Sequence, residues 1–344
     1  MNVLIIGGAR FIGPYVVKKL IEQGNDVTVF HRGKSKTPLP DGVTHIYGDR
    51  KDLNEFKSQI EKGRPDVVVD MIPITEHQAK TLVAVFRGIT NRIIAISSQD
   101  VYRAYGVLLG KEKGIEEQPS RENSPLREKL YPYRGDEPRA DDDPRKILDD
   151  YDKIPIEKII MNSPGIKGTV LRLPMVYGPN DYQHRLFEHL KRMDDNRPAI
   201  IVPAKLAQWR TSRGYVENVA YGIALAITDD KSVNRIYNVA EPDDFTEADW
   251  IRHIAQVAGW NGKVVIVPEE KLPSEYAADF NADQHLTADT TRIRTELGYR
   301  EQIPLEKALA STIEWERNNP PPVQAAQFDY KKEDEILQSL GFHQ

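Results

Sequence analysis

The first thirteen residues most constrain what this chain of 344 residues can fold into. Val3 to Ile6 form a short apolar run, which is typical of a strand buried on both faces of a parallel sheet. A glycine-rich turn follows, and residues 14–22 then have apolar positions mostly on one face of a helix. Glycines permit a tight turn, and a helix N-terminus presents free N–H groups to a pyrophosphate. This order of strand, turn and helix predicts a dinucleotide-binding site; the alternative is a tight turn without a ligand.

The turn departs from the usual G-x-G-x-x-G pattern at one position. Counting from Gly8, Arg10 stands where the middle glycine is expected. We expect Arg10 to add a cation beside the pyrophosphate. The predicted cofactor contacts of the turn are Gly7, Gly8, Arg10, Phe11, Ile12 and Gly13.

Composition limits the classes of function. Apolar residues at 40% and charged residues at 29% are ordinary for a globular protein. The net charge of -5 argues against nucleic-acid binding as the main function. The absence of cysteine excludes disulfides, zinc–thiolate sites and cysteine nucleophiles, and no metal site is predicted. No apolar stretch is long enough to span a bilayer, and the strand at residue 3 leaves no room for a signal peptide, so we expect a cytoplasmic protein.

Strand and helix patterns alternate over the first half of the chain. Predicted strands lie at 26–30, 43–47, 66–72, 92–96 and 169–173, and predicted helices at 52–62, 76–87 and 155–161. Short connections between them imply right-handed crossovers. The predicted fold class is therefore α/β, a Rossmann-type doubly wound parallel sheet with a smaller α/β substrate domain.

Two domains are expected from these patterns. Residues 1–175 form the predicted dinucleotide-binding domain, with a long insertion at about 103–150 that is either a lid or a solvated loop. Residues 176–344 form the predicted substrate-binding domain, partly interleaved with the first and including a late helix at 305–318.

Several motifs occur in a fixed order along the chain. They are Gly7-Gly8-x-x-Phe11-Ile12-Gly13, Gly48-Asp49, Ser97-Ser98-x-x-Val101-Tyr102, Arg172-x-Pro174-x-Val176-Tyr177-Gly178-Pro179, Tyr215-Val216-Glu217-Asn218-Val219-Ala220, Tyr237-Asn238-Val239 and Leu297-Gly298-Tyr299. With these motifs the chain resembles the NAD-dependent epimerase/dehydratase family, the extended short-chain dehydrogenases/reductases, over roughly residues 1–315. The form of its glycine turn is similar to an atypical branch that includes the chloroplast stem-loop-binding proteins.

The resemblance implies hydride transfer assisted by a serine, a tyrosine and a lysine. Ser98 lies four residues before Tyr102, where the family's serine lies. The usual tyrosine precedes its lysine by four residues, but Tyr151 precedes Lys153 by only two. Residues two apart on a regular helix face different directions, so Tyr151 can act as the acid/base only if the helix begins after it. Otherwise Tyr131 or Tyr133 of the insertion serves, or the site is not redox-active.

The second strand ends in a basic segment. His31, Arg32 and Lys34 follow it without an acidic residue, which favours the 2′-phosphate of NADP(H) over NAD(H). Asp49 is expected to face the adenine. The resemblance further implies cofactor contacts from a group of residues at other strand ends, which are Arg50, Met71, Ser97, Pro174 and Val176.

The predicted substrate pocket contains arginines and aromatic residues. Arginine suits a phosphate or carboxylate, and aromatic rings suit sugar or base faces. The candidates are Tyr177, Arg185, Trp209, Arg210, Arg213 and Tyr215.

The leading hypothesis is an NAD(P)-dependent oxidoreductase, epimerase or dehydratase acting on a hydroxylated, anionic, nucleotide-sugar-like substrate. The alternative is a nucleotide-binding protein of the same fold without redox turnover, associated with RNA. A homodimer is compatible with the sequence, and no membrane partner is expected.

Overall fold

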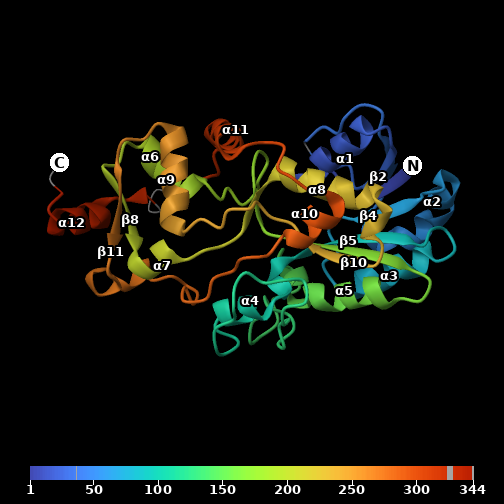
Figure 1. Ribbon diagram of the computed structural model, residues 1–344, viewed down its shortest axis with the longest axis horizontal. Helices are drawn as coiled ribbons and strands as arrows, with labels where there is room; N and C mark the ends of the chain where they lie inside the picture. The colour runs from blue at the N-terminus through green and yellow to red at the C-terminus, as the bar shows by residue number, and fades with distance from the viewer. Residues whose placement is uncertain (36, 324–327, 343–344) are drawn as a thin grey trace.

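The computed structural model describes residues 1–35, 37–323 and 328–342. A large part is built on one parallel sheet, at the right in Figure 1, and a smaller part lies at the left. Most of the smaller part comes from the chain beyond residue 176.

The main sheet has seven strands, all parallel to their neighbours. They are β1 (Asn2–Ile6), β2 (Asp26–His31), β3 (Thr44–Tyr47), β4 (Val67–Asp70), β5 (Arg92–Ser98), β6 (Lys167–Leu173) and β10 (Arg235–Asn238). Their order is β10-β6-β5-β4-β1-β2-β3. The strand order reverses between β1 and β4, as in doubly wound sheets. The predicted Rossmann-type fold class is confirmed.

Helices cover both faces of this sheet. On one face α1 (Ile12–Glu22) packs beside α8 (Val216–Thr228), and on the other α3 (Glu76–Phe86) packs beside α5 (Lys153–Asn162) (Figure 1). Side chains alternate along a strand. Val3 and Ile5 therefore enter the core under α1 and α8, whereas Leu4 and Ile6 enter the core under α3 and α5. This double burial explains the continuous apolar run at the start of the chain.

The helix predicted at 52–62 is divided into two elements. A 3-10 segment, η1 (Arg50–Phe56), is followed by α2 (Lys57–Gly63). Asp52 within η1 has non-helical backbone angles, φ -102° and ψ 18°, so the segment is kinked there.

The smaller part has its own pair of strands. β8 (Ala199–Pro203) and β11 (Lys263–Val267) pair in parallel, and α6 (Phe187–Asp194) packs against α9 (Glu247–Ala258). β7 (Met175–Tyr177) pairs with β9 (Arg213–Tyr215). The remaining helices are α7 (Ala204–Gln208), α10 (Thr291–Leu297), α11 (Leu305–Asn318) and α12 (Lys331–Ser339), and within the described ranges no helix is long and apolar enough to cross a bilayer.

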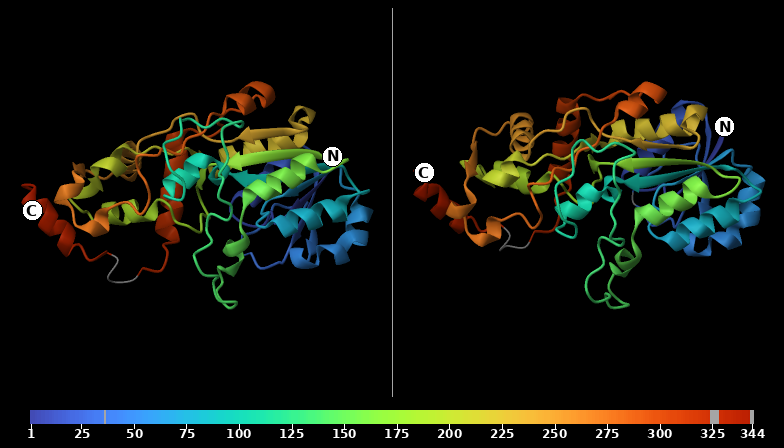
Figure 2. Two further views of the ribbon diagram at one scale, coloured as in Figure 1. Left: turned by 90° about the horizontal axis from the view of Figure 1, so that it is seen from below. Right: turned by 60° about the horizontal axis from the view of Figure 1, so that its bottom comes forward.

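The insertion at 103–150 contains α4 (Arg103–Leu108), irregular chain and a final 3-10 turn, η3 (Lys146–Asp150). Its later part extends beyond the sheet and its helices in both views of Figure 2. A buried ion pair between Arg127 and Asp152 fixes it, with both side chains 1% exposed and 3.1 Å between Nη2 and Oδ1. Since Asp152 caps α5, the insertion is anchored at the start of that helix.

A second buried ion pair joins the sheet to α5. Arg172 on β6 donates from Nε and Nη2 to the two carboxylate oxygens of Glu157, at 3.0 and 2.7 Å. Ser97 on β5 donates to the same carboxylate at 2.5 Å. The charges of Arg172 and Glu157 therefore neutralise each other in a place where neither can be hydrated.

Removing Glu157 should destabilise the fold strongly. Glu157→Ala leaves the guanidinium of Arg172 buried without its carboxylate, and we expect the free energy of unfolding to fall by about 3–5 kcal/mol. Urea denaturation measures this loss. The matched control is Lys158→Ala, an exposed neighbour on α5, which should change stability by less than about 0.5 kcal/mol. Equal effects of the two substitutions would contradict this account of the ion pair.

Candidate active site

The turn between β1 and α1 permits a very close approach of backbone to backbone. A Cβ atom at Gly13 would lie 2.4 Å from both the carbonyl carbon and the oxygen of Gly8. Gly7 has φ +86°, and a Cβ there would lie 2.6 Å from Cγ1 of Ile72. Glycine is therefore required at both ends of the turn, by packing at Gly13 and by conformation at Gly7.

The start of α1 is open to an anion. Phe11 at the N-cap makes no side-chain capping bond, and the first turn contains no acidic residue. Arg10 is exposed beside it. An uncapped helix start beside a turn that begins with two glycines fits the pyrophosphate of a dinucleotide. Phe11 and Ile12 are partly buried and pack against the core.

Aromatic residues gather where β2 and β3 end. Nε2 of His31 lies 2.9 Å from Nδ1 of His45, and the ring of Tyr47 stacks on His45. Burial and the neighbouring His45 lower the pKa of His31. Arg32 and Lys34 are exposed beyond this cluster, so their cations are accessible to a phosphate.

Asp49 and Arg50 both have partners within the protein. The carboxylate of Asp49 accepts a hydrogen bond from the Lys51 backbone, so it caps η1. Arg50 bonds both oxygens of the fully buried Asp70 at 3.1 and 2.8 Å, and the carbonyl of Ile72 at 2.6 Å. Arg50 therefore holds together the ends of β3 and β4 beside the glycine turn.

The two serines that end β5 have different roles. The hydroxyl of Ser97 bonds Glu157 inside the protein, whereas the Ser98 hydroxyl accepts a bond from the Asp100 backbone at 3.2 Å. Ser98 is partly exposed and Ser97 is buried. Three further residues are predicted to contact the cofactor. Of these, Met71 and Val176 are buried and Pro174 is half-buried.

Tyr151 lies in extended backbone before α5, which begins at Lys153. The condition for Tyr151 to reach the edge of the sheet is thus met. Its hydroxyl donates a hydrogen bond of 2.7 Å to Oδ2 of Asp100, in the segment that follows β5. Lys153 is buried, with Nζ donating to the carbonyl oxygens of Pro73 and Ile96 and lying 5.5 Å from the centre of the Tyr151 ring. Serine, tyrosine and lysine therefore come from adjoining segments despite their unusual spacing.

Burial controls the proton affinities at this place. Burial raises the pKa of Asp100, and burial together with the charge of Asp100 raises the pKa of Tyr151. Burial lowers the pKa of Lys153 to about 8. A phenol with a raised pKa stays protonated at neutral pH, and a neutral phenol is a poor base. It can still accept a proton if it passes its own proton to the carboxylate at the same time.

Asp100 is the functional candidate that the sequence analysis missed. Its side chain is buried, and Oδ1 has no hydrogen-bond partner among the described residues. The available signal was a carboxylate two residues after the expected catalytic serine, in the segment that leaves the central strand.

Most of the predicted substrate residues are engaged in internal contacts. Arg213 bonds Glu247 at 2.5 Å, Arg185 bonds Asp181 at 2.8 Å, and the indole N–H of Trp209 bonds the carbonyl of Gln284. Tyr177 and Tyr215 are each 1% exposed, and their hydroxyls donate to Glu241 and Glu217. The burial and the internal partners of these five residues do not support their predicted contact with a substrate.

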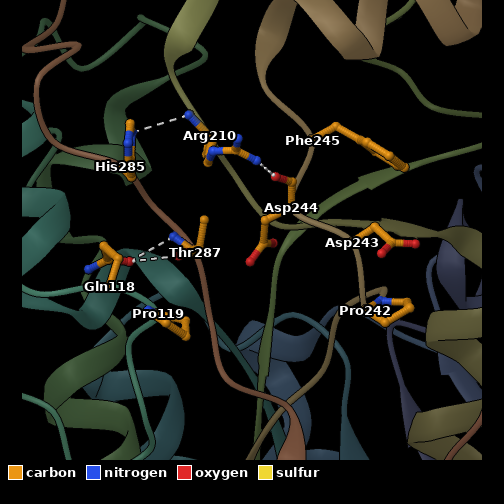
Figure 3. A pocket seen from close by; sticks show the side chains of 9 residues that line it. All are labelled: Gln118, Pro119, Arg210, Pro242, Asp243, Asp244, Phe245, His285 and Thr287. Atoms are coloured by element: carbon orange, nitrogen blue, oxygen red, sulfur yellow. Dashed lines mark hydrogen bonds between the residues drawn. The ribbon is translucent and has the colours of Figure 1, made fainter.

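Arg210 differs from the other five because it is exposed and lines a cavity of about 500 Å³ (Figure 3). The cavity also has Phe245, His285 and Asp244 on its walls, and Arg210 donates to the carbonyl of Asp244 at 2.6 Å. Arg210 is therefore the predicted substrate residue with the clearest access to a ligand.

Comparisons with known proteins show the family and the fold of the chain. A family model described as the NAD dependent epimerase/dehydratase family matches residues 3–125 and 129–240. The chain is 24% identical over 337 residues to the chloroplast stem-loop binding protein of 41 kDa b of Arabidopsis thaliana, covering 90% of this chain and 78% of that protein. It is 25% identical over 342 residues to UDP-N-acetyl-alpha-D-glucosaminuronate decarboxylase of Bacillus cytotoxicus, covering 91% of this chain and 97% of that protein. The UDP-glucose 4-epimerase of Thermus thermophilus in complex with NAD has a TM-score of 0.65 at 19% identity, covering 93% of this chain and 100% of that one.

Substitutions in the glycine turn should abolish dinucleotide binding. Gly13→Val drives a side chain into the Gly8 backbone, so α1 can no longer close the turn, and we expect no binding of NADPH by calorimetry. Gly63→Ala is the matched control, because a Cβ there meets nothing within 4 Å.

A second substitution guards against misfolding. Arg10→Glu changes an exposed side chain and should weaken NADPH binding roughly tenfold or more by placing an anion beside the phosphates. Unchanged NADPH affinity in both folded variants would refute the site.

Proposed function

Because the chain belongs to the NAD-dependent epimerase/dehydratase family, we propose that it is an NAD(P)-dependent enzyme that oxidises or epimerises a hydroxyl-bearing carbon of a nucleotide-sugar-like substrate. The observation that carries the proposal is the 2.7 Å hydrogen bond from Tyr151 to Asp100, beside Ser98 and Lys153. This arrangement supplies a proton acceptor at the strand edge that the glycine turn also borders.

The proposed proton transfer uses two residues in sequence. The substrate hydroxyl gives its proton to the phenol oxygen of Tyr151, while the proton of Tyr151 passes to Oδ2 of Asp100. The net base is thus the carboxylate, and no tyrosinate of high energy has to persist. The Ser98 hydroxyl orients the substrate oxygen.

The nicotinamide dinucleotide, when bound, supplies the hydride acceptor for the same carbon. The glycine turn and α1 bind its phosphates, and Arg32 with Lys34 binds the adenosine end. Lys153 faces the nicotinamide ribose in this proposal. The lysine is pre-oriented by the carbonyls of Pro73 and Ile96.

The proposed substrate class rests on relatives and on Arg210. The similar decarboxylase of Bacillus cytotoxicus and the NAD-bound epimerase of Thermus thermophilus are named for uridine-diphosphate sugars. Arg210 is exposed at a cavity of about 500 Å³ whose walls contain none of Ser98, Tyr151 and Lys153, so it is the guanidinium itself that suits an anionic group. An anionic, hydroxylated substrate fits both observations.

NADP(H) should bind more tightly than NAD(H). Arg32 is an exposed cation at the end of β2, where a 2′-phosphate would lie, so Arg32→Ala should weaken NADPH binding roughly tenfold or more and leave NADH binding nearly unchanged. Calorimetric titration of both cofactors measures this. Arg87→Ala, which removes an exposed arginine at the end of α3, is the control. Equal or tighter binding of NAD(H) by the unmodified protein would overturn the preference.

Tyr151→Phe should lower turnover at least about a hundredfold without weakening cofactor binding, because the phenol links the substrate to Asp100. Steady-state kinetics with uridine-diphosphate sugars measures turnover, and the fluorescence of the bound dinucleotide measures cofactor affinity. Tyr131→Phe is the control, since the Tyr131 ring contacts Arg134 rather than the Asp100 carboxylate. Near-normal turnover in Tyr151→Phe would assign the acid/base role to another residue.

RNA binding without redox turnover is the second candidate function. The likeness to the chloroplast stem-loop binding protein favours it, whereas the net charge of -5 opposes it. Electrophoretic titration with a stem-loop RNA at several salt concentrations tests it. Tight, salt-dependent binding together with no turnover of nucleotide sugars would support this candidate over the enzyme.

A further inference from the structure

A second phenol from the insertion reaches the same carboxylate oxygen as Tyr151. Tyr133 donates to Oδ2 of Asp100 at 3.3 Å, and Tyr105 on α4 donates to the hydroxyl of Tyr133 at 3.0 Å. The rings of Tyr133 and Tyr151 meet edge to face with centres 5.0 Å apart. Three hydroxyl groups and one carboxylate therefore form a continuous chain of hydrogen bonds.

Among the described residues, the hydrogen bonds to the carboxylate of Asp100 come from the phenols of Tyr151 and Tyr133. Arg127 donates to the backbone oxygen of Asp100 and to Asp152, and Lys153 donates to backbone carbonyls. Neither cation bonds the carboxylate of Asp100. The titratable and charged groups facing it are Tyr151, Tyr133, Arg127, Lys153 and Asp152, with Tyr105 one hydrogen bond further away.

We propose that Tyr133 and Tyr105 extend the Tyr151–Asp100 couple into a proton path, and that the insertion therefore takes part in catalysis. This inference rests on the proposed function, because it needs a proton to arrive at Asp100. Tyr133 and Tyr105 are positioning residues in this scheme, since they act on Asp100 and not on the substrate.

Protons are conserved along this path because each phenol accepts one proton and gives up another. After substrate oxidation the O–H proton of the substrate is on Tyr151 and the former Tyr151 proton is on Asp100. Asp100 then donates to the Tyr133 oxygen, Tyr133 donates to the Tyr105 oxygen, and Tyr105 releases its own proton to water. Every tyrosine ends neutral and Asp100 is again a carboxylate. Tyr105 is half-buried and so keeps solvent-exposed surface.

The insertion is held firmly enough to keep these distances. Arg127 donates both to the backbone oxygen of Asp100 and to the carboxylate of Asp152, the residue after Tyr151. The backbone N–H of Tyr131 also donates to Asp152, at 2.6 Å. Arg139 bonds the buried Asp149 just before Tyr151. The segment that carries Tyr133 is therefore tied down on both sides.

The first test is the pH dependence of turnover in Tyr133→Phe and Tyr105→Phe. Removing a donor to the carboxylate raises the pKa of Asp100, so the acidic limb of the kcat profile should move to higher pH in Tyr133→Phe. We expect kcat to fall about tenfold, with KM unchanged, and a smaller effect in Tyr105→Phe. Tyr131→Phe, in the same segment, should keep the profile of the unmodified protein.

A purely structural role of Tyr133 predicts a different result. It would lower kcat or stability without moving the acidic limb, and that outcome would overturn the proposal.

The second test needs no substrate and so separates this inference from the proposed function. Carbon-13 NMR of tyrosines labelled at Cζ compares the chemical shift of each phenol in the unmodified protein and in Asp100→Asn at neutral pH, where both phenols stay protonated. Loss of the carboxylate weakens the hydrogen bonds that Tyr133 and Tyr151 donate, so both Cζ resonances should move together. An unchanged Tyr133 in Asp100→Asn would refute the path, whether or not the protein turns over a nucleotide sugar.

Discussion

Parallel pairing brings the carboxyl ends of seven strands to one edge of the main sheet, and the candidate site depends on this constraint. The glycine turn follows β1, Arg32 follows β2, Asp70 ends β4 and Asp100 follows β5. These groups therefore lie at the same edge of the sheet, where each can affect the charge and the hydrogen bonds of its neighbours. Burial at this edge raises the pKa of Asp100.

The strands of the main sheet could be predicted from sequence because burial on both faces demands continuous apolar runs. The predicted ends of β1 to β6 lie within two residues of the observed ends. Helices α6 and α12, two of those that were not predicted, are more polar and are held by distant partners. Arg192 near the end of α6, for example, bonds Glu333 on α12, and such a pairing leaves no periodic signal.

The candidate site divides in the same way. The glycine turn is local, so its residues and spacing reveal it, whereas the contact of Tyr151 with Asp100 joins residues 51 positions apart. Arginine content pointed to an anionic pocket, but Arg213 is neutralised by Glu247, 34 positions away, which sequence alone does not indicate. Residue types could thus be predicted, and their partners could not.

The return of the chain to the main sheet has a consequence for how this protein can be divided. β10 covers the outer side of β6, and α8 lies beside α1, although both come from beyond residue 176. A fragment ending at residue 175 would expose an unpaired strand edge and the apolar face beneath α8, two features that promote aggregation. The two parts of the chain therefore depend on each other for folding, and a fragment limited to the first half lacks part of the main sheet's own cover.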